Sequence, residues 1–195
     1  MRLRKMYVPL AVALAVLAAA CSSSGGSTTT KSAAKSLEVS PSGDIPDTQT
    51  FVPFTPTSGG YTIKVPEGWA RSTAGSKTTF ADHFNTVAVE ATPSAGAPTD
   101  AGVRAVDIPA LQRTSSGFKL NQVSTMSRTA GPTIVVAYDL SSSSDPTTGK
   151  HVTLTAEQYK FWRGGKLVTV TLAAPKGSDN VDAWKTITNS FAWTQ

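Results

Sequence analysis

The feature that most constrains the fold is a series of β-branched and aromatic segments in the last third of the chain. Residues 134–140, 152–162 and 167–173 are rich in Val, Ile, Thr, Tyr and Phe, and Gly164-Gly165 separates the last two. A pair of glycines between such segments is typical of a tight hairpin, because both central residues of the turn adopt positive φ. We therefore predict an antiparallel ribbon in this region.

The apolar pattern of these segments indicates how they are covered. Apolar side chains occupy both alternation phases of residues 134–140, and the phase changes within residues 152–162. This pattern predicts either burial on both faces or a bulge near Glu157-Gln158. Earlier in the chain, three further regions continue the strand pattern: residues 60–69 with a turn at 66–68, residues 78–80 and residues 86–92.

Two segments carry helical signals. Val181, Trp184, Ile187 and Phe191 recur at spacings of three and four after a capping residue, Ser178 or Asp179. Residues 99–114 form a second candidate, in which Pro109 predicts a break and Asp107 a cap for a short second helix. The expected fold class is α+β: a mainly antiparallel sheet flanked by helices on both faces, an α/β/α sandwich.

The first twenty residues have the composition of a secretory signal. Arg2, Arg4 and Lys5 precede an apolar run that ends in three alanines, 18–20. The apolar run is too short to span a bilayer, which needs about 20 apolar residues. We expect residues 1–20 to be removed as a signal peptide.

Cys21 follows the three alanines directly, and it is the single cysteine of the chain. The segment Leu17–Cys21 looks like a bacterial lipobox, in which the thiol is acylated before cleavage. An unpaired thiol in an exported chain is otherwise a reactive liability. We expect lipidation of Cys21, with palmitate among the acyl chains, to hold the protein on the extracytoplasmic face of the cell membrane. The alternative is a plain signal-peptidase site beside an incidental cysteine.

Residues 21–49 contain mostly Ser, Thr, Gly, Lys and Pro. Such a segment buries too little apolar surface to fold, so it is expected to be a disordered tether, on the order of 30 Å long on average. Residues 50–195 then form a single globular domain. Three of the 18 basic residues lie in the signal, which leaves 15 against 13 acidic ones. This balance gives no electrostatic footprint for nucleic acid.

Three segments rich in aromatic residues carry a resemblance to a known family: 60–69, 159–162 and 180–193. Over roughly residues 61–193 the chain resembles the LpqN-type actinobacterial lipoproteins and, more broadly, the Mog1/PsbP fold. The resemblance implies a compact sheet sandwiched by helices and a domain that acts by binding. It also implies a role in cell-envelope processes, including envelope lipid transport.

No catalytic, metal or cofactor motif appears in the sequence. His83 and His151 have no Cys or His at metal-ligand spacing, and no Gly-x-Ser-x-Gly elbow or phosphate-binding loop is present. We interpret His83 as a loop residue and His151 as a solvated residue at a strand start. No cofactor is expected. The alternative is an enzyme, in the form of a serine hydrolase that acts on envelope material.

The aromatic residues 159, 161, 162, 184, 191 and 193 either form core or line an apolar ligand site. Strand and helix spacing favours core for most of them, which leaves Tyr159, Trp162 and Trp193 as weak ligand-binding candidates. The expected function is therefore a non-catalytic binding or accessory role in the envelope, with lipids or envelope proteins as partners. The alternative of a passive surface protein fits the same sequence features, and the sequence leaves the oligomeric state open.

Overall fold

The computed structural model describes residues 43–144 and 148–194, all within one compact unit that spans Glu38–Gln195. The expected signal peptide, Cys21 and most of the expected tether lie outside these residues. Ten strands occur in the described part of the chain: β1 (Phe51–Phe54), β2 (Tyr61–Pro66), β3 (Ala70–Ala74), β4 (Lys77–Asp82), β5 (Asn85–Pro93), β6 (Lys119–Arg128), β7 (Gly131–Ser141), β8 (Thr153–Arg163), β9 (Lys166–Pro175) and β10 (Ala192–Trp193).

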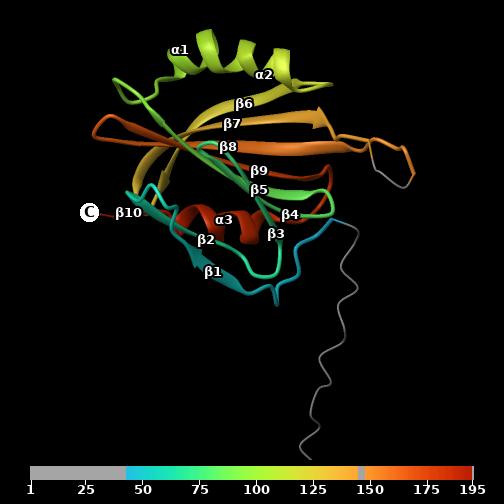
Figure 1. The fold of residues 1–195 in the computed structure, drawn as a ribbon. Helices are drawn as coiled ribbons and strands as arrows, with labels where there is room; N and C mark the ends of the chain where they lie inside the picture. The colour runs from blue at the N-terminus through green and yellow to red at the C-terminus, as the bar shows by residue number, and fades with distance from the viewer. Residues whose placement is uncertain (1–42, 145–147, 195) are drawn as a thin grey trace, which may run out of the picture. The chain divides into compact units, whose positions relative to one another are not determined.

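The strands form two antiparallel sheets (Figure 1). Seven of them make a large sheet in the order β3-β4-β5-β9-β8-β7-β6, and β1-β2-β10 make a small one. The predicted hairpin is confirmed, because β8 and β9 pair from Arg163↔Lys166 onward across Gly164 and Gly165, with φ of 56° and 84°. Positive φ at both positions is what a two-residue turn of this kind requires.

β8 pairs with β7 and β9 without a register shift, so the alternative of a bulge near Glu157-Gln158 is wrong. Both faces of this strand are buried instead: Tyr159 and Phe161 face one core cluster, and Ala156 faces the other. The irregularity lies in β6, between Leu120 and Gln122. β7 and β8 also form an antiparallel pair, up to Ser141↔Thr153.

The helices are α1 (Asp100–Gly102), η1 (Val103–Asp107), α2 (Ile108–Thr114) and α3 (Val181–Asn189). The first three run on without a break, so the predicted interruption before Pro109 is wrong. η1 is a π-helical turn in which the Ile108 N–H bonds to the Val103 carbonyl, five residues back. This wider turn accommodates the proline ring, which would clash with a carbonyl in a regular α-helix. Asp107 makes no capping bond.

Each face of the large sheet has its own cover (Figure 1). The α1–η1–α2 segment packs on one face through Val103 and Ile108. The opposite face packs against α3 and the small sheet together, through Ile187, Phe191, Tyr61 and Ile63. The mainly antiparallel sheet is as expected, but the picture of helices alone on both faces was too simple, because β1, β2 and β10 supply much of the second layer.

The expected domain start at residue 50 is too late. Ile45 is buried, its N–H donates to Asn180 Oδ1 at 2.6 Å, and the Asp179 N–H donates to Asp44 Oδ1 at 2.9 Å. Asn180, rather than Ser178 or Asp179, is the N-cap residue of α3, and its side chain is engaged by this segment instead of capping the helix. None of the helices in the described part of the chain is long and apolar enough to span a membrane.

Candidate functional site

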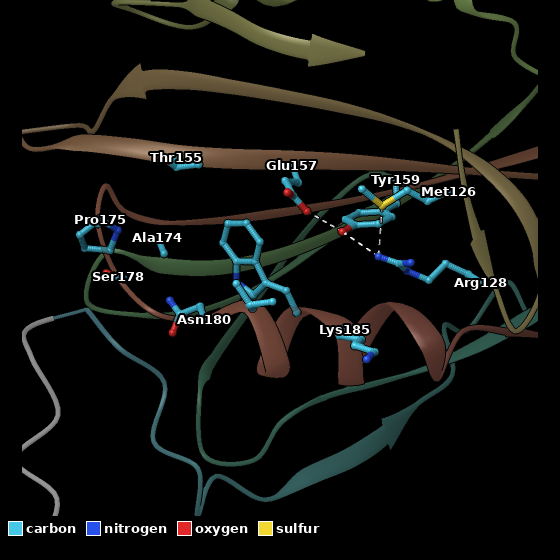
Figure 2. Close-up of a pocket in the computed structure, with 13 residues that line it drawn as sticks. Met126, Arg128, Thr155, Glu157, Tyr159, Ala174, Pro175, Ser178, Asn180 and Lys185 are labelled. Atoms are coloured by element: carbon cyan, nitrogen blue, oxygen red, sulfur yellow. Dashed lines mark hydrogen bonds between the residues drawn. The ribbon is translucent and has the colours of Figure 1, made fainter. Parts of the chain in front are cut away.

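A groove of about 410 Å³ runs between α3 and the strands β6, β8 and β9 (Figure 2). We call it the α3 groove. Its walls are formed by Met126, Arg128, Thr155, Glu157, Tyr159, Ala174, Pro175, Gly177, Ser178, Asn180, Val181, Trp184 and Lys185.

Strand alternation determines which side chains reach the α3 groove. On β8, Thr155, Glu157 and Tyr159 lie two residues apart and therefore share the face toward α3. Met126 and Arg128 do the same at the end of β6, which is an edge strand of the large sheet as the described residues form it. The groove therefore lies where α3 leaves part of the large sheet uncovered.

Arg128, Tyr159 and Glu157 form a hydrogen-bonded triad on the sheet side of the groove (Figure 2). Arg128 Nη2 donates to the Tyr159 hydroxyl at 3.2 Å, and that hydroxyl donates to Glu157 Oε2 at 2.5 Å. The Arg128 guanidinium also lies 5.0 Å from the centre of the Tyr159 ring. Its Nε donates to Thr188 Oγ1 at 2.9 Å, which ties the triad to α3. The triad is therefore a fixed polar surface with one carboxylate, one guanidinium and a phenol hydroxyl between them.

The environment of Tyr159 keeps its hydroxyl protonated. Burial, a hydrogen bond to Glu157 and the charge of that carboxylate raise the pKa of Tyr159 to about 12, although Arg128 opposes the shift. A protonated phenol can accept from Arg128 while it donates to Glu157. The hydroxyl therefore acts as a bridge between the two charges.

The rest of the groove is largely apolar. Trp184 and Val181 project from α3, and Ala174 and Pro175 contribute from the end of β9. Val181 is 71% exposed, and with Val106 it is one of two large apolar side chains so exposed among the described residues. Apolar surface beside a fixed polar group is the usual composition of a small-molecule site.

The start of the described chain lies beside the groove. Asn180 Nδ2 donates to the Gly43 carbonyl at 3.0 Å, and Asn180 also lines the groove. The neighbouring Ser178 hydroxyl is buried without a hydrogen-bond partner among the described residues. The described chain thus begins at this end of the groove.

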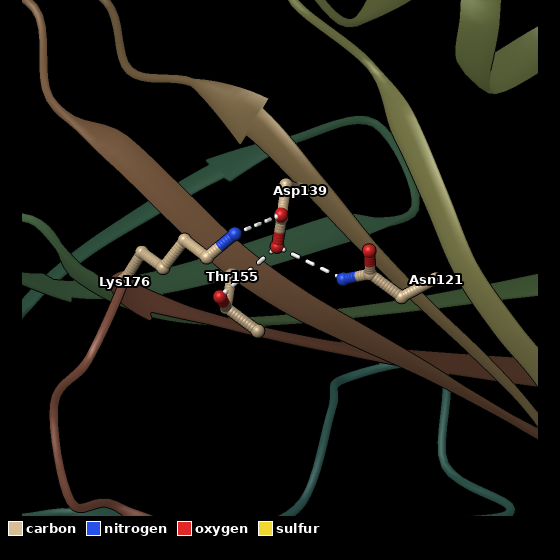
Figure 3. A network of polar contacts seen from close by, with 4 residues as sticks. All are labelled: Asn121, Asp139, Thr155 and Lys176. Carbon is tan, nitrogen blue, oxygen red and sulfur yellow. Dashed lines mark hydrogen bonds and ion pairs between the residues drawn. The ribbon is translucent and has the colours of Figure 1, made fainter.

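A second polar network adjoins the groove at Thr155 (Figure 3). Asp139 is buried, and it accepts hydrogen bonds from Asn121 Nδ2 at 2.9 Å, Thr155 Oγ1 at 3.1 Å and Lys176 Nζ at 2.6 Å. Burial alone would raise its pKa, but these hydrogen bonds and the Lys176 charge outweigh burial and hold the pKa of Asp139 below its usual value. Both carboxylate oxygens of Asp139 have partners within the fold, which indicates a structural role.

The three ligand-binding candidates from the sequence do not lie together. Tyr159 belongs to the triad of the α3 groove. Trp162 lies on the opposite face of β8, where its Nε1 donates to the Ser94 carbonyl at 3.1 Å. Trp193 packs edge-on against Phe191, with ring centres 5.1 Å apart, at the margin of the core. Phe161 and Phe191 are fully buried and stacked at 4.1 Å.

The two histidines have local partners. His83 is exposed in the β4–β5 turn with φ of 51°, and its Nδ1 lies 2.9 Å from Asp82 Oδ1. His151 Nδ1 lies 2.8 Å from the Ser142 carbonyl. Neither ring has a hydrogen bond with a serine hydroxyl in the described ranges 43–144 and 148–194. In the same ranges, no group of three or more His, Cys, Asp and Glu side chains is arranged to hold a metal ion.

The sequence did not point to Arg128 or Glu157. Arg128 ends a polar edge strand that has no apolar alternation, and Glu157 was considered only as part of a bulge. One feature of the sequence could have revealed the triad: Glu157 lies on the same strand face as Tyr159. A charged side chain on a buried face requires an oppositely charged or hydrogen-bonding partner. The partner itself comes from a strand about thirty residues away and could not be identified from spacing.

No family model and no curated protein matches the sequence. Solved structures do match. Cyanobacterial PsbP (CyanoP) from Synechocystis sp. PCC 6803 is 18% identical over 79% of this chain and 99% of that one, with a TM-score of 0.50. The Ran-binding protein Mog1p of Saccharomyces cerevisiae is 9% identical over 74% and 95%, with a TM-score of 0.47.

Mycobacterium tuberculosis LpqN, described as involved in cell envelope biogenesis, is 16% identical over 76% of this chain and 93% of that one, with a TM-score of 0.45. A Bacteroides thetaiotaomicron protein is 12% identical with a TM-score of 0.45; the match covers 73% of this chain and only 48% of that longer one. The likeness to CyanoP shows the fold, a PsbP-like one. Membership of the LpqN-type family stays a prediction.

Proposed function

We propose that this chain is a lipid-anchored binding protein of the cell envelope, and that its α3 groove takes a single amphiphilic molecule. The apolar chain of that molecule would lie against Trp184 and Val181, and its head would meet the triad of Arg128, Tyr159 and Glu157. The observation that carries the proposal is the presence of both surfaces in one groove. The role is binding rather than catalysis.

The charges of the triad indicate the chemistry of the head group. Within the triad Glu157 and Arg128 offset each other, and Lys185 on α3 adds one positive charge to the groove lining. Tyr159 occupies only Glu157 Oε2, which leaves Oε1 as an acceptor for a ligand hydroxyl. A hydroxyl-bearing head that donates to Glu157 is therefore the head group that the triad matches best.

The predicted lipid on Cys21 would supply the setting for this function. A chain anchored at Cys21 reaches the domain at Gly43, and Gly43 is bonded to a residue of the groove. The anchor would then attach on the groove's side of the domain, which favours exchange of an amphiphile with the membrane. Transport support and simple storage of the ligand are both compatible with this arrangement.

Fluorescence displacement and native mass spectrometry test the binding role. The purified chain, with residues 1–20 removed and Cys21→Ser, is mixed with N-phenyl-1-naphthylamine and titrated with a monoacylglycerol. We expect the monoacylglycerol to displace the dye and to appear as a one-to-one adduct. Absence of both dye binding and an adduct would contradict the proposal.

Two exposed valines provide a matched pair of variants. Val181→Ser removes apolar surface from the groove, so affinity should fall about fivefold, in line with roughly 1 kcal/mol of lost apolar contact. Val106→Ser makes the same change on η1, outside the groove lining, and should leave affinity unchanged. Equal effects of the two substitutions would show that binding occurs elsewhere.

Mass spectrometry of the protein isolated from its own membranes tests the anchor. We expect an acylated Cys21 at the mature N-terminus, and Cys21→Ala should release the protein from the membrane. An unmodified thiol on membrane-free protein would overturn the proposed location without affecting the binding experiments.

A further inference from the structure

A second cavity, of about 480 Å³, lies on the same face of the large sheet but toward β3, β4 and β5. Its walls come from the β1–β2 loop, the β3–β4 hairpin and the β8–β9 hairpin, so we call it the hairpin pocket. It shares no lining residue with the α3 groove. The hairpin pocket is therefore a separate candidate site.

Arg71 provides one cation of the hairpin pocket. Its guanidinium carbon lies 4.8 Å from the centre of the Phe54 ring and 5.9 Å from that of Phe80, so two aromatic rings hold it in place. Within residues 43–144 and 148–194, the guanidinium makes no hydrogen bond or ion pair. The aromatic rings contact the face of the guanidinium group and leave the N–H groups at its edge available. Two such N–H groups can donate parallel hydrogen bonds to one oxyanion.

Lys166 provides the second cation. Its Nζ lies 3.5 Å from the Gly59 carbonyl, which is a long and weak hydrogen bond. A Cβ on Gly60 would lie 2.4 Å from this Nζ, and Gly60 has φ of 90°. The Lys166 ammonium group therefore lies over the β1–β2 turn, beside Gly59 and Gly60.

Between the two cations the lining carries hydroxyl groups and no carboxylate. Thr57, Ser58, Thr73 and Ser76 are among the hydroxyl-bearing residues of the lining. Glu90 on β5 accepts a hydrogen bond from Ser76 Oγ of the lining at 3.4 Å, but Glu90 itself lines a cavity on the other face of the sheet. The hairpin pocket therefore has a net charge of two positive units, surrounded by neutral hydrogen-bonding groups.

We propose that the hairpin pocket binds a phosphate-bearing polyol or sugar. Arg71 and Lys166 neutralise the two charges of the phosphate, and the threonine and serine hydroxyls bond to the hydroxyls of the polyol. The same chemistry occurs in a free sugar phosphate and in the head group of an anionic membrane lipid. This site differs from the α3 groove, where the Glu157 carboxylate lies beside Arg128 in one hydrogen-bonded triad.

Two arms of one experiment distinguish these sources. In the first, glucose 6-phosphate is titrated into the ¹⁵N-labelled chain with residues 1–20 removed and Cys21→Ser, with glucose as the uncharged comparison. In the second, the same protein is sedimented with phosphatidylglycerol vesicles or with phosphatidylcholine vesicles. We expect binding in at least one arm, with amide shifts at Thr73 and Ser76 in the first.

Charge-removing variants locate the site. Arg71→Gln and Lys166→Gln should each weaken the binding by tenfold or more, and Lys77→Gln, which changes a cavity on the opposite face of the sheet, should leave it unchanged. Binding by glucose 6-phosphate alone assigns a free ligand, and binding by the anionic vesicles alone assigns a lipid head group. No binding in either arm overturns the proposal, as does binding that Lys77→Gln weakens as much as Arg71→Gln.

Discussion

At the scale of single residues, the buried polar groups show how the fold accommodates charge. Asp139 has a side chain only 7% exposed, yet three donors from β6, β8 and the residue after β9 satisfy it. Its lowered pKa is the result of that complete set of partners. The network ties together four chain segments, so it stabilises the end of the sheet next to the α3 groove.

The stability of the domain should therefore depend on the protonation of Asp139. Its pKa in the folded state lies below the usual 3.8, so its contribution is complete above about pH 5 and is lost as the pH falls through 4 and below. Asp139→Asn should cost about 2 kcal/mol at pH 7 and less at pH 3. Urea unfolding at both pH values measures this, and an equal cost at the two would contradict it.

The three tyrosines of the described chain should ionise late. Burial raises the pKa of Tyr61 to about 12. Burial also raises the pKa of Tyr138 to about 12, although a hydrogen bond with Gln158 partly offsets it. The pKa of Tyr159 is likewise about 12. Since raised pKa values favour the neutral form in the fold, their contribution to stability is lost as the pH rises above about 10. Absorbance at 295 nm should stay flat up to about pH 11; a rise centred near pH 10 in folded protein would refute this.

At the scale of elements, one ion pair links the α1–η1–α2 segment to the sheet. Lys160 on β8 is buried, with a side chain 4% exposed, and its Nζ lies 2.6 Å from Asp107 Oδ1 at the end of η1. The sequence predicted Asp107 as a helix cap, because a cap is a local role. Its actual partner lies 53 residues away and faces η1 only because β8 passes beneath the π-helical turn.

Breaking this pair from its two sides should have unequal effects. Asp107→Asn leaves the Lys160 charge buried and unpaired, so we expect a loss of about 2 kcal/mol in the free energy of unfolding. Lys160→Met removes the buried charge and keeps an apolar stem, so its cost should be smaller. Guanidinium unfolding of both variants tests the order.

A third variant is the control for this comparison. Arg104→Gln breaks an exposed ion pair with Asp100 in the same helical segment, and exposed pairs of this kind contribute little to stability. We therefore expect its unfolding midpoint to stay close to that of the parent chain. A larger loss for Lys160→Met than for Asp107→Asn would contradict the account of the buried pair.

The strands that sequence analysis missed are edge strands. β1 contains Pro53, which is tolerated because β2 is the one strand that pairs with β1 in the part of the chain that the structure describes. β6 is polar along most of its length and pairs only with β7. Hydrophobic alternation identifies strands that are covered by other layers, and neither of these strands carries that signal. Because β6 supplies Arg128, missing it also meant missing the triad.

At the scale of the whole molecule, the N-terminal part of the described chain belongs to the domain. Ile45 is 7% exposed, and residues 43–45 bond to residues 179 and 180. The composition of residues 21–49 suggested a uniform tether. Isolated apolar residues in a polar segment do not distinguish a tether from a segment that docks, since docking depends on the surface available to them.

Removal of this segment should destabilise the domain. A chain that begins at Thr50 loses the burial of Ile45, worth about 2 kcal/mol, and should melt about 6 °C below a chain that begins at Gly43. Ile45→Ala in the longer chain should reproduce part of the loss. Equal Tm values for the two lengths would mean that residues 43–49 do not stabilise the fold.

The sequence by itself determined the inner antiparallel strands, the β8–β9 hairpin and the final helix, because turn chemistry and side-chain periodicity are local properties. It also carries the expectation of an anchor at Cys21. Only the tertiary structure decided that the small sheet covers one face, that Arg128 meets Tyr159 and Glu157, and that Arg71 and Lys166 share a pocket. Those contacts join residues from separate strands, and their pairing depends on sheet order and layer packing, which no local pattern encodes.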